Sequence, residues 1–166
     1  GTFLGRRGSN RDITERKQAE EDIRRMNERF SLAANAARLG VWDWDIQKNE
    51  LVWDDRMYAL YGIKREDFTG AYEAWLKGVH PDDRARVDQA WQAALHGASY
   101  SLEHRIVVDG TIYWVHEQAK LEFDADGAPQ RGIGTVQDIT ERKQMEEALR
   151  CGEERYRRLT EDMPAL

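Results

Sequence analysis

Alternating apolar and polar residues predict two short strands in the central part of the chain. Trp42, Trp44 and Ile46 are spaced two residues apart, so they share one face of an extended segment. A polar turn at residues 47–50 leads into a second apolar stretch at residues 51–53. This pattern predicts a hairpin whose tryptophans face a core, because successive side chains of a strand point to opposite faces.

Three further strands are predicted toward the C-terminal half, at about residues 100–108, 111–123 and 132–137. Asp-Gly dipeptides separate them at residues 109–110 and 126–127. Asp-Gly between alternating segments is a strong signal for a tight hairpin turn, since its residues accept positive φ angles. We therefore expect these strands to run antiparallel in a meander.

Short helices are predicted between the two groups of strands. Asp54 or Asp55 is placed to cap one of them, and Gly62 ends it. The sequence His-Pro-Asp-Asp at residues 80–83 marks the start of a longer helix, because proline fits the first helical position and acids complement the helix dipole. Strands, then helices, then strands predict an α+β domain with one antiparallel sheet.

A seven-residue sequence, Asp-Ile-Thr-Glu-Arg-Lys-Gln, occurs twice, at residues 12–18 and 138–144. Such a repeat predicts that the chain is one period of a tandem array. The predicted boundaries follow from it. They are residues 1–14 for the tail of a preceding unit, 15–39 for a connector and capping helix, 40–138 for the domain, and 139–166 for an outgoing connector helix and the start of the next unit.

Each copy of the repeat is predicted to convert a strand into a helix. Asp138 and Glu141 have the spacing of a capping box with Asp in place of Ser or Thr. Thr140 offers a second helix cap, and good helix formers follow. The same conversion is expected at Asp12.

Apolar residues at heptad spacing continue from each copy. They are Ile23, Met26, Phe30, Ala33 and Ala37 after the first copy, and Leu149, Tyr156, Leu159 and Met163 after the second. For residues 15–29 this pattern favours a partner helix, because so polar a helix gains little from burial within its own chain. Residues 30–39 are less charged, so we expect this part of the helix to pack on its own domain. The pattern predicts a homodimer through the connector helices.

Composition narrows the class of protein. The 166 residues include 40% hydrophobic and 34% charged residues, with a formal net charge of −6, and the mean hydropathy is −0.81. These values fit one core with exposed charged helices and argue against a nucleic-acid partner, which needs a basic face. No segment has the ~20 apolar residues of a membrane span. We predict no direct membrane contact and a cytoplasmic location, with any membrane anchor elsewhere in a longer parent.

Four motifs in order resemble a PAS domain with its C-terminal PAC region, of the subgroup with a His-Pro-Asp-Asp-Arg element. They are Gly-Val-Trp-Asp-Trp-Asp at residues 40–45, the His-Pro-Asp-Asp-Arg element at 80–84, Tyr-Trp-Val at 113–115 and Asp-Ile-Thr-Glu-Arg-Lys at 138–143. The resemblance covers residues 27–143. It implies a five-stranded antiparallel sheet of order 2-1-5-4-3, with helices on one face and an N-terminal capping helix.

The resemblance also implies a bacterial multi-PAS sensor protein, usually dimeric, whose output is a histidine kinase, GGDEF or EAL domain. None of those output motifs occurs in this chain. No Ser-His or Cys-His constellation and no phosphate-binding loop occurs either, so we predict no catalytic residue. The prediction is a relay module in which Asp138, Thr140 and Glu141 pass a signal to the outgoing helix, joined to adjacent PAS and output domains.

Two alternatives remain open. One is a small-molecule or cofactor site, holding a metabolite or a non-covalent flavin, in a cavity faced by Tyr58, Trp91, His104, Ile106 and Val115. Residues 40–137 contain no cysteine, which argues against thiol-adduct photochemistry, and we expect no bound cofactor and no metal site. The other is a ligand-free dimerisation spacer. Ile112 and Trp114 fall on the opposite sheet face, which either the N-terminal helix or a dimer partner must cover.

Overall fold

The computed structural model describes residues 7–70 and 72–161 and divides the chain after residue 37 into a helical unit and a domain. The helical unit is α1, Arg7–Ala36. The expectation of a strand ending near Asp12 is wrong, because residues 12–18 lie inside α1. A strand there would need a neighbouring strand to pair with, whereas the strong helix formers around it extend the helix.

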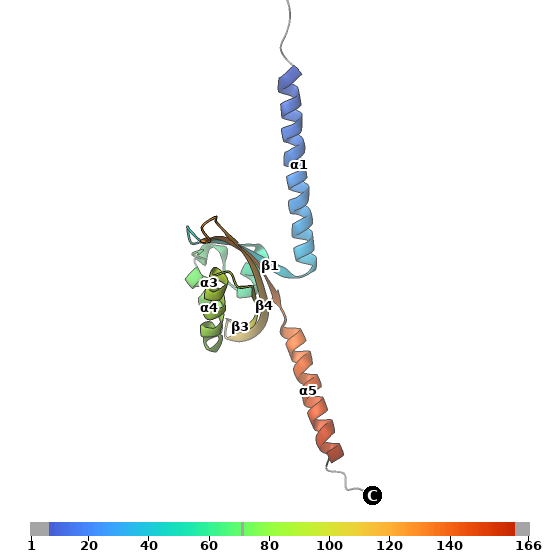
Figure 1. The fold of residues 1–166 in the computed structure, drawn as a ribbon. Coiled ribbons are helices and arrows are strands. Elements are labelled where there is room, and N and C mark those ends of the chain that lie inside the picture. The colour runs from blue at the N-terminus through green and yellow to red at the C-terminus, as the bar shows by residue number, and fades with distance from the viewer. Residues whose placement is uncertain (1–6, 71, 162–166) are drawn as a thin grey trace, which may run out of the picture. The chain divides into compact units, whose positions relative to one another are not determined.

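The domain contains five strands and the helices between and after them (Figure 1). Their bounds are β1 Leu39–Asp45, β2 Glu50–Trp53, α2 Asp55–Tyr61, a 3-10 turn Arg65–Asp67, α3 Tyr72–Gly78, α4 Pro81–Leu95, β3 Tyr100–Val108, β4 Thr111–Phe123, β5 Pro129–Asp138 and α5 Thr140–Glu161. The strands form one antiparallel sheet of order β2-β1-β5-β4-β3, which confirms the predicted fold. Helices α3 and α4 cover one face of this curved sheet.

Local signals in the sequence explain where α2 begins and ends. Asp54 caps α2, because its carboxylate accepts a hydrogen bond from the backbone N–H of Met57 at 2.8 Å. The other oxygen of the same carboxylate accepts one from the N–H of Val41 on β1 at 3.0 Å. Gly62 ends the helix with φ of 64°, a left-handed conformation that glycine adopts without strain. Asp54 thus fixes α2 to the sheet as well as starting it.

The helix start predicted at His80 is also present. The His80 ring accepts a hydrogen bond from the backbone N–H of Asp82 through Nδ1 at 3.2 Å, so this histidine caps α4. The predicted turn between β3 and β4 has φ of 48° at Asp109 and 78° at Gly110, as a two-residue hairpin requires. Both features were predicted from residue type alone, because the interactions that produce them are local.

The core lies between the sheet and the helices on its covered face. Its buried apolar members are Trp42, Trp44, Trp53, Met57, Tyr61, Trp75, Val79, Val87, Trp91, Ala94, Tyr100, Ile106, Val115 and Val136. The predicted alternation is confirmed in the middle of the strands, where the inward residues of β1, β3 and β4 are buried, and Ile112 on the other face of β4 is 46% exposed. It fails at the far end of β4, where Phe123, predicted on the inward side, is 38% exposed. Aromatic rings dominate this core and pack edge to face as well as stacked.

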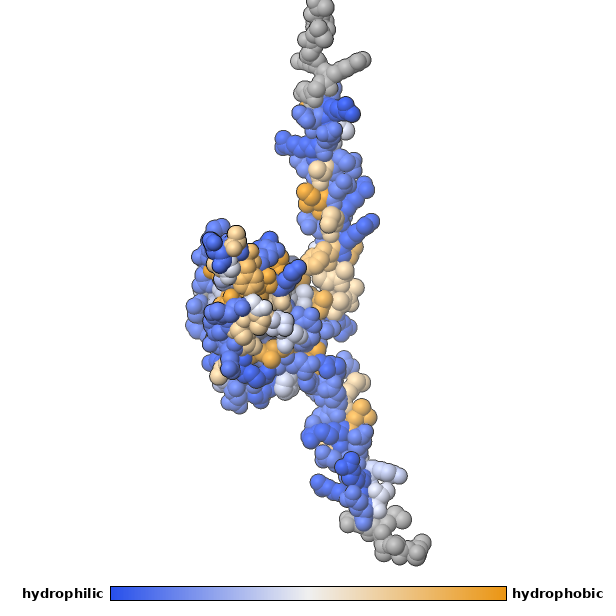
Figure 2. Space-filling model, viewed as in Figure 1, coloured by the Kyte–Doolittle hydropathy of each residue, from blue (hydrophilic) through white to orange (hydrophobic). Residues whose placement is uncertain are grey.

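The heptad residues of both long helices are largely exposed. On α5, Leu149, Tyr156 and Leu159 are between 65% and 71% exposed, and Met163 lies outside the described residues. Figure 2 shows apolar side chains as separate patches along helices that are otherwise hydrophilic. Within residues 7–70 and 72–161, the structure has no helix with both the length and the apolarity that crossing a membrane requires.

Candidate functional site

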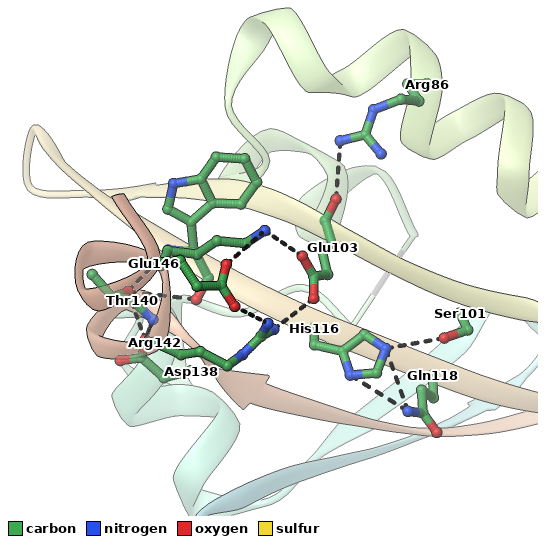
Figure 3. Close-up of polar contacts among 11 residues, drawn as sticks. Arg86, Ser101, Glu103, His116, Gln118, Asp138, Thr140, Arg142 and Glu146 are labelled. Atoms are coloured by element: carbon green, nitrogen blue, oxygen red, sulfur yellow. Dashed lines mark hydrogen bonds and ion pairs between the residues drawn. The ribbon is translucent and has the colours of Figure 1, made fainter. Parts of the chain in front are cut away.

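The joint between β5 and α5 is built from hydrogen bonds that reach a neighbouring strand (Figure 3). The Thr140 hydroxyl accepts a bond from the backbone N–H of Trp114 on β4 at 2.9 Å and donates one to the Asp138 carboxylate at 2.6 Å. The same carboxylate accepts a bond from the Thr140 N–H at 2.9 Å. The backbone N–H of Ile139 donates to the Trp114 carbonyl at 2.8 Å. The first residues of α5 are therefore tied to β4.

Asp138 and Thr140 thus contact each other at the start of α5, whereas Glu141, predicted to form a capping box with Asp138, does not join them. The Glu141 side chain makes no hydrogen bond to any described residue, so the expected capping box is absent. The physical reason is the frame of the helix. Because α5 begins at Thr140, the third helical position is occupied by Arg142, a cation that cannot reach back as a glutamate does.

Glu103 on β3 is a part of this joint that the sequence reasoning missed. Its carboxylate lies 2.5 Å from the Arg142 guanidinium and 2.5 Å from the Lys143 ammonium, both in the first turn of α5. These two cations, Lys143 foremost, lower the pKa of Glu103 to about 2. Glu103 stands on the polar face of a predicted strand, yet only the folded register shows that α5 begins above it.

The cavity found in the core has a different lining from the one predicted from the sequence. An aromatic chamber in the core is lined by Trp42, Trp44, Leu51, Trp53, Tyr72, Trp75, Trp91 and Glu117, and its free volume is about 20 Å³. That volume has room for about one water molecule. Of the five predicted residues only Trp91 lines it.

The other four predicted pocket residues lie outside the chamber lining. His104, Ile106 and Val115 are fully buried in the packed core next to it. Tyr58 is half-buried and packs against Trp53 and Phe68 instead. The face assignment was right for three of the four, but the large aromatic side chains fill the space in front of them.

A buried carboxyl stands in the wall of the chamber. Glu117 on β4 is 1% exposed, and the hydroxyl of Tyr100 donates a hydrogen bond to it at 3.2 Å. Burial raises the pKa of Glu117 to about 8, so the group is mostly protonated at neutral pH. The alternation of β4 between Val115 and Ala119 already places residue 117 on the inner face, and this was the signal that could have identified it.

His104 is the second buried titratable group of the core. It is fully buried on β3, and its Nε2 lies 3.9 Å from the Glu117 carboxylate. Burial lowers the pKa of His104 to about 4, so the imidazole is neutral at pH 7. Glu117 and His104 therefore form a neutral pair inside an aromatic core, and either of them would become charged at a cost.

Several buried polar atoms around the chamber have no hydrogen-bond partner among the described residues. They are the indole N–H groups of Trp42, Trp53 and Trp91 and both ring nitrogens of His104. Unpaired buried polar groups are uncommon in folded proteins and each one costs free energy. The three indoles belong to residues that line the chamber, but the surface facing its free space is apolar, so an acceptor could reach these donors only if the side chains rearranged.

The packing of β5 makes room for this chamber. The ring of Trp42 lies against Gly134, where an added Cβ would collide with the indole. A glycine is therefore needed at this strand position because the ring crosses directly over the backbone.

In residues 7–70 and 72–161, no group of three or more His, Cys, Asp or Glu side chains is placed to hold a metal ion.

The fold and the joint together define a class of sensory domains, with a five-stranded sheet, helices over one face and a strand that leads into an outgoing helix. The family model described as PAS fold matches residues 50–136, and the chain belongs to this family. The match confirms the resemblance to PAS domains and includes two of the four motifs, those at residues 80–84 and 113–115.

Proteins that resemble the chain are parts of bacterial signalling systems. The chain is 33% identical to the probable diguanylate cyclase DgcE of Escherichia coli K12 over 83% of its own length and 12% of that protein. It is 28% identical to the two-component sensor PprA of Pseudomonas aeruginosa over 100% of its length and 18% of that protein. It thus spans less than a fifth of either relative.

A solved structure supports the same assignment. The crystal structure of a sensory box histidine kinase/response regulator from Burkholderia thailandensis is 32% identical to the chain and superposes with a TM-score of 0.67. The likeness covers 78% of this chain and 98% of that one. The fold, and the place of the chain among PAS sensory domains, are therefore established.

Proposed function

We propose that this chain is a non-catalytic sensory and relay module of a longer signalling protein. In this proposal the core changes state, the change reaches the end of β5, and the joint at Asp138 and Thr140 alters how α5 is held. The main support for this proposal is a hydrogen bond that links β4 to α5. The hydroxyl of Thr140, the first residue of α5, accepts it from the backbone of β4. A shift of β4 therefore acts directly on the helix start.

The output of the parent protein is part of this proposal. The relatives named above are a probable diguanylate cyclase and a two-component sensor, and in each of them the matching region is a small part of the protein. We infer that a histidine kinase or a diguanylate cyclase domain receives the signal. The exposed heptad residues of α5 support a homodimer in which the connector helices pair.

The test uses a longer protein that carries this module and an output domain. Asp138→Ala removes the carboxylate that holds Thr140 in place, and loss of such a cap costs about 0.5–2 kcal/mol. We expect output activity, or its response to the stimulus, to change by severalfold while the domain stays folded. Glu141→Gln is the matched control, because the Glu141 side chain makes no hydrogen bond within the described residues. Unchanged output in folded Asp138→Ala would refute the relay.

A second candidate function is binding of a small molecule in the aromatic chamber. The three unpaired indole N–H groups favour it, since an acceptor-bearing ligand would satisfy them. The free volume of about 20 Å³ requires the chamber to widen for anything larger than water. The native mass of the purified chain, its absorbance spectrum and a thermal-shift screen with small aromatic acids test this. Apo mass with no stabilising compound would count against a ligand and favour the dimerisation spacer.

A further inference from the structure

Helix α4 holds the free edge of strand β3. The Asp83 carboxylate, near the start of α4, accepts hydrogen bonds from the Arg105 backbone N–H at 2.8 Å and from its guanidinium at 2.7 and 3.1 Å. The backbone N–H of His80 donates to the Arg105 carbonyl at 2.9 Å. An edge strand normally exposes such groups to other chains. Here both backbone groups of Arg105 are occupied by the segment that starts α4.

The charge of Asp83 is well supported in this position. Asp83 is 6% exposed, and its hydrogen bonds with Arg105 lower the pKa of the carboxyl to about 2. A buried carboxylate with a forked arginine partner has a fixed geometry, because two parallel bonds define both distance and orientation. The start of α4 and residue 105 of β3 are therefore joined by contacts of defined geometry.

Glu103, two residues earlier on the same edge, contacts both helices at once (Figure 3). Its backbone carbonyl accepts a hydrogen bond from Arg86 of α4 at 3.0 Å. Its carboxylate binds Arg142 and Lys143 of α5. One residue of β3 thus stands between the helix that covers the core and the helix that leaves the domain.

The Trp114 side chain completes a second contact between the same elements. Trp114 pairs directly with Arg105 across the two strands. The Arg105 guanidinium lies 5.8 Å and the Lys143 ammonium 5.0 Å from the centre of the Trp114 ring, within the range of cation–π attraction. The indole therefore connects a residue held by α4 with a residue of α5, while the Trp114 backbone holds Thr140.

We propose that Glu103 and Arg105 are positioning residues of a second coupling path, which runs from α4 along the edge of β3 to the first turn of α5. The proposal rests on the relay function above and adds to it. Helix α4 carries Trp91, whose ring contacts Trp42 and Tyr100 around the chamber. A displacement of α4 by a change in the core would reach α5 through these side chains, in parallel with the joint at the end of β5.

The first experiment compares two glutamates that share the same cations. Glu146 lies 2.9 Å from Arg142 and 4.0 Å from Lys143, but it belongs to α5 itself. The Lys143 amide, which donates to the Ile139 carbonyl at 2.9 Å, reports on the first turn of α5. We expect Glu103→Gln to speed its hydrogen exchange by about threefold, and Glu146→Gln to have a much smaller effect. Added salt should speed this exchange in the unaltered chain but not in Glu103→Gln. Equal effects of the two substitutions, or no change in salt dependence, would overturn the proposal.

The second experiment tests whether α4 acts through Arg105. Asp83→Asn should speed exchange in the first turn of α5, and it should add nothing in a chain that already carries Arg105→Gln. Amides of β1 in the same samples report any general loss of stability, and the comparison is made relative to them. Arg105→Lys keeps a cation near Trp114 but loses the forked contact with Asp83, so it should resemble Asp83→Asn. Independent, additive effects would show that no such path exists.

These measurements need no output domain, so they separate the two proposals. Suppose that exchange in the first turn of α5 changes with substitution of Glu103 and Asp83, but the output of the longer protein is unchanged by Asp138→Ala. That result would support the coupling and reject the relay function. An output that depends on Asp138, with α5 exchange indifferent to Glu103, would reject the coupling alone.

Discussion

Residues 12–18 and 138–144 have the same sequence, yet the first copy lies in the interior of α1 and the second joins β5 to α5. The isoleucine of the first copy, Ile13, is 49% exposed, whereas Ile139 is 5% exposed. The Thr14 hydroxyl donates to the Asn10 carbonyl one turn earlier at 2.8 Å. The equivalent hydroxyl of Thr140 instead accepts a bond from β4.

The charged residues of the two copies differ in the same way. Arg16 pairs with Glu20 of its own helix at 3.2 Å. Arg142 pairs with Glu103 of the sheet as well as with its own helix. The comparison shows that these seven residues are compatible with a continuous helix and become a joint only where a sheet supplies partners. The proposed relay function would therefore depend on the contact between the motif and the sheet.

The strongest way to test this dependence is to destabilise the core on which the second copy rests. The folded domain raises the pKa of Glu117 from 4.5 to about 8, so the folded state holds this proton more tightly. Glu117 alone should lower the free energy of unfolding by on the order of 4 kcal/mol as pH rises from about 4.5 through 8. His104, whose pKa is lowered from 6.5 to about 4, acts in the opposite direction between those two values, so the net fall should lie mainly between about pH 6.5 and 8. Urea midpoints measured across this range check it. Amide protection, taken relative to the base-catalysed intrinsic exchange rate at each pH, should fall at residues 139–144 and stay unchanged at 12–18.

Glu117→Gln is the control for the pH dependence, because glutamine has the same shape and stays neutral. The variant should lose the decline in stability between about pH 6.5 and 8 and should keep the rise that His104 produces below pH 6.5. A decline of the same size in Glu117→Gln would show that another group is responsible.

The next largest effect is expected from the two isoleucines. Ile139→Ala removes a buried side chain and should lower the free energy of unfolding by about 3 kcal/mol. Ile13→Ala changes an exposed helix position, where the expected effect is within about 0.5 kcal/mol. Urea unfolding followed by tryptophan fluorescence measures both. Similar losses in the two variants would contradict the difference between the copies.

A smaller effect is expected from the two threonines. Thr140→Val keeps the shape of the side chain but leaves the Trp114 N–H without its acceptor, which should cost about 1 kcal/mol. Thr14→Val removes only a hydrogen bond within an exposed helix turn. It should change the free energy of unfolding by about 0.3 kcal/mol, since valine and threonine have similar helix propensity. Thermal unfolding of both variants decides it; a larger effect for Thr14→Val would be inconsistent with the joint.

The smallest effect is expected at Glu141. Since its side chain makes no hydrogen bond within the described residues, Glu141→Gln should change the unfolding free energy by less than about 0.5 kcal/mol, all of it from the loss of a charge near the helix N-terminus. The same thermal measurement applies. A loss of stability as large as that of Thr140→Val would indicate that Glu141 does take part in the capping box that the sequence predicted.

The features that could be predicted from the sequence are those set by neighbouring residues. The cap of α2 at Asp54 or Asp55, the start of α4 at residues 80–83, the Asp-Gly turn at residues 109–110 and the inward face of β3 with His104 all follow from residue type and spacing. The family resemblance added the strand order, which local patterns do not determine. These parts needed no knowledge of which strands meet.

The features that escaped prediction depend on contacts between distant parts of the chain. Glu103 meets α5 only because β3 lies beside β4 in the sheet, and Thr140 finds its partner only in the register of β4. The chamber differs from the predicted pocket because aromatic volume, rather than face assignment, decides which residues border free space. The expectation at Asp12 failed for the related reason that a motif read alone does not show whether a sheet is present.

The most direct test of the central claim is native-state amide exchange of the unaltered chain in increasing urea. The Ile139 amide, bonded to the Trp114 carbonyl at 2.8 Å, should exchange only when the sheet unfolds, so its urea dependence should match that of amides in β4 and β5. The amide of Ile13 should exchange through local opening of α1, with little urea dependence. If the two isoleucine amides instead showed the same urea dependence, the second copy would not be a joint held by the sheet.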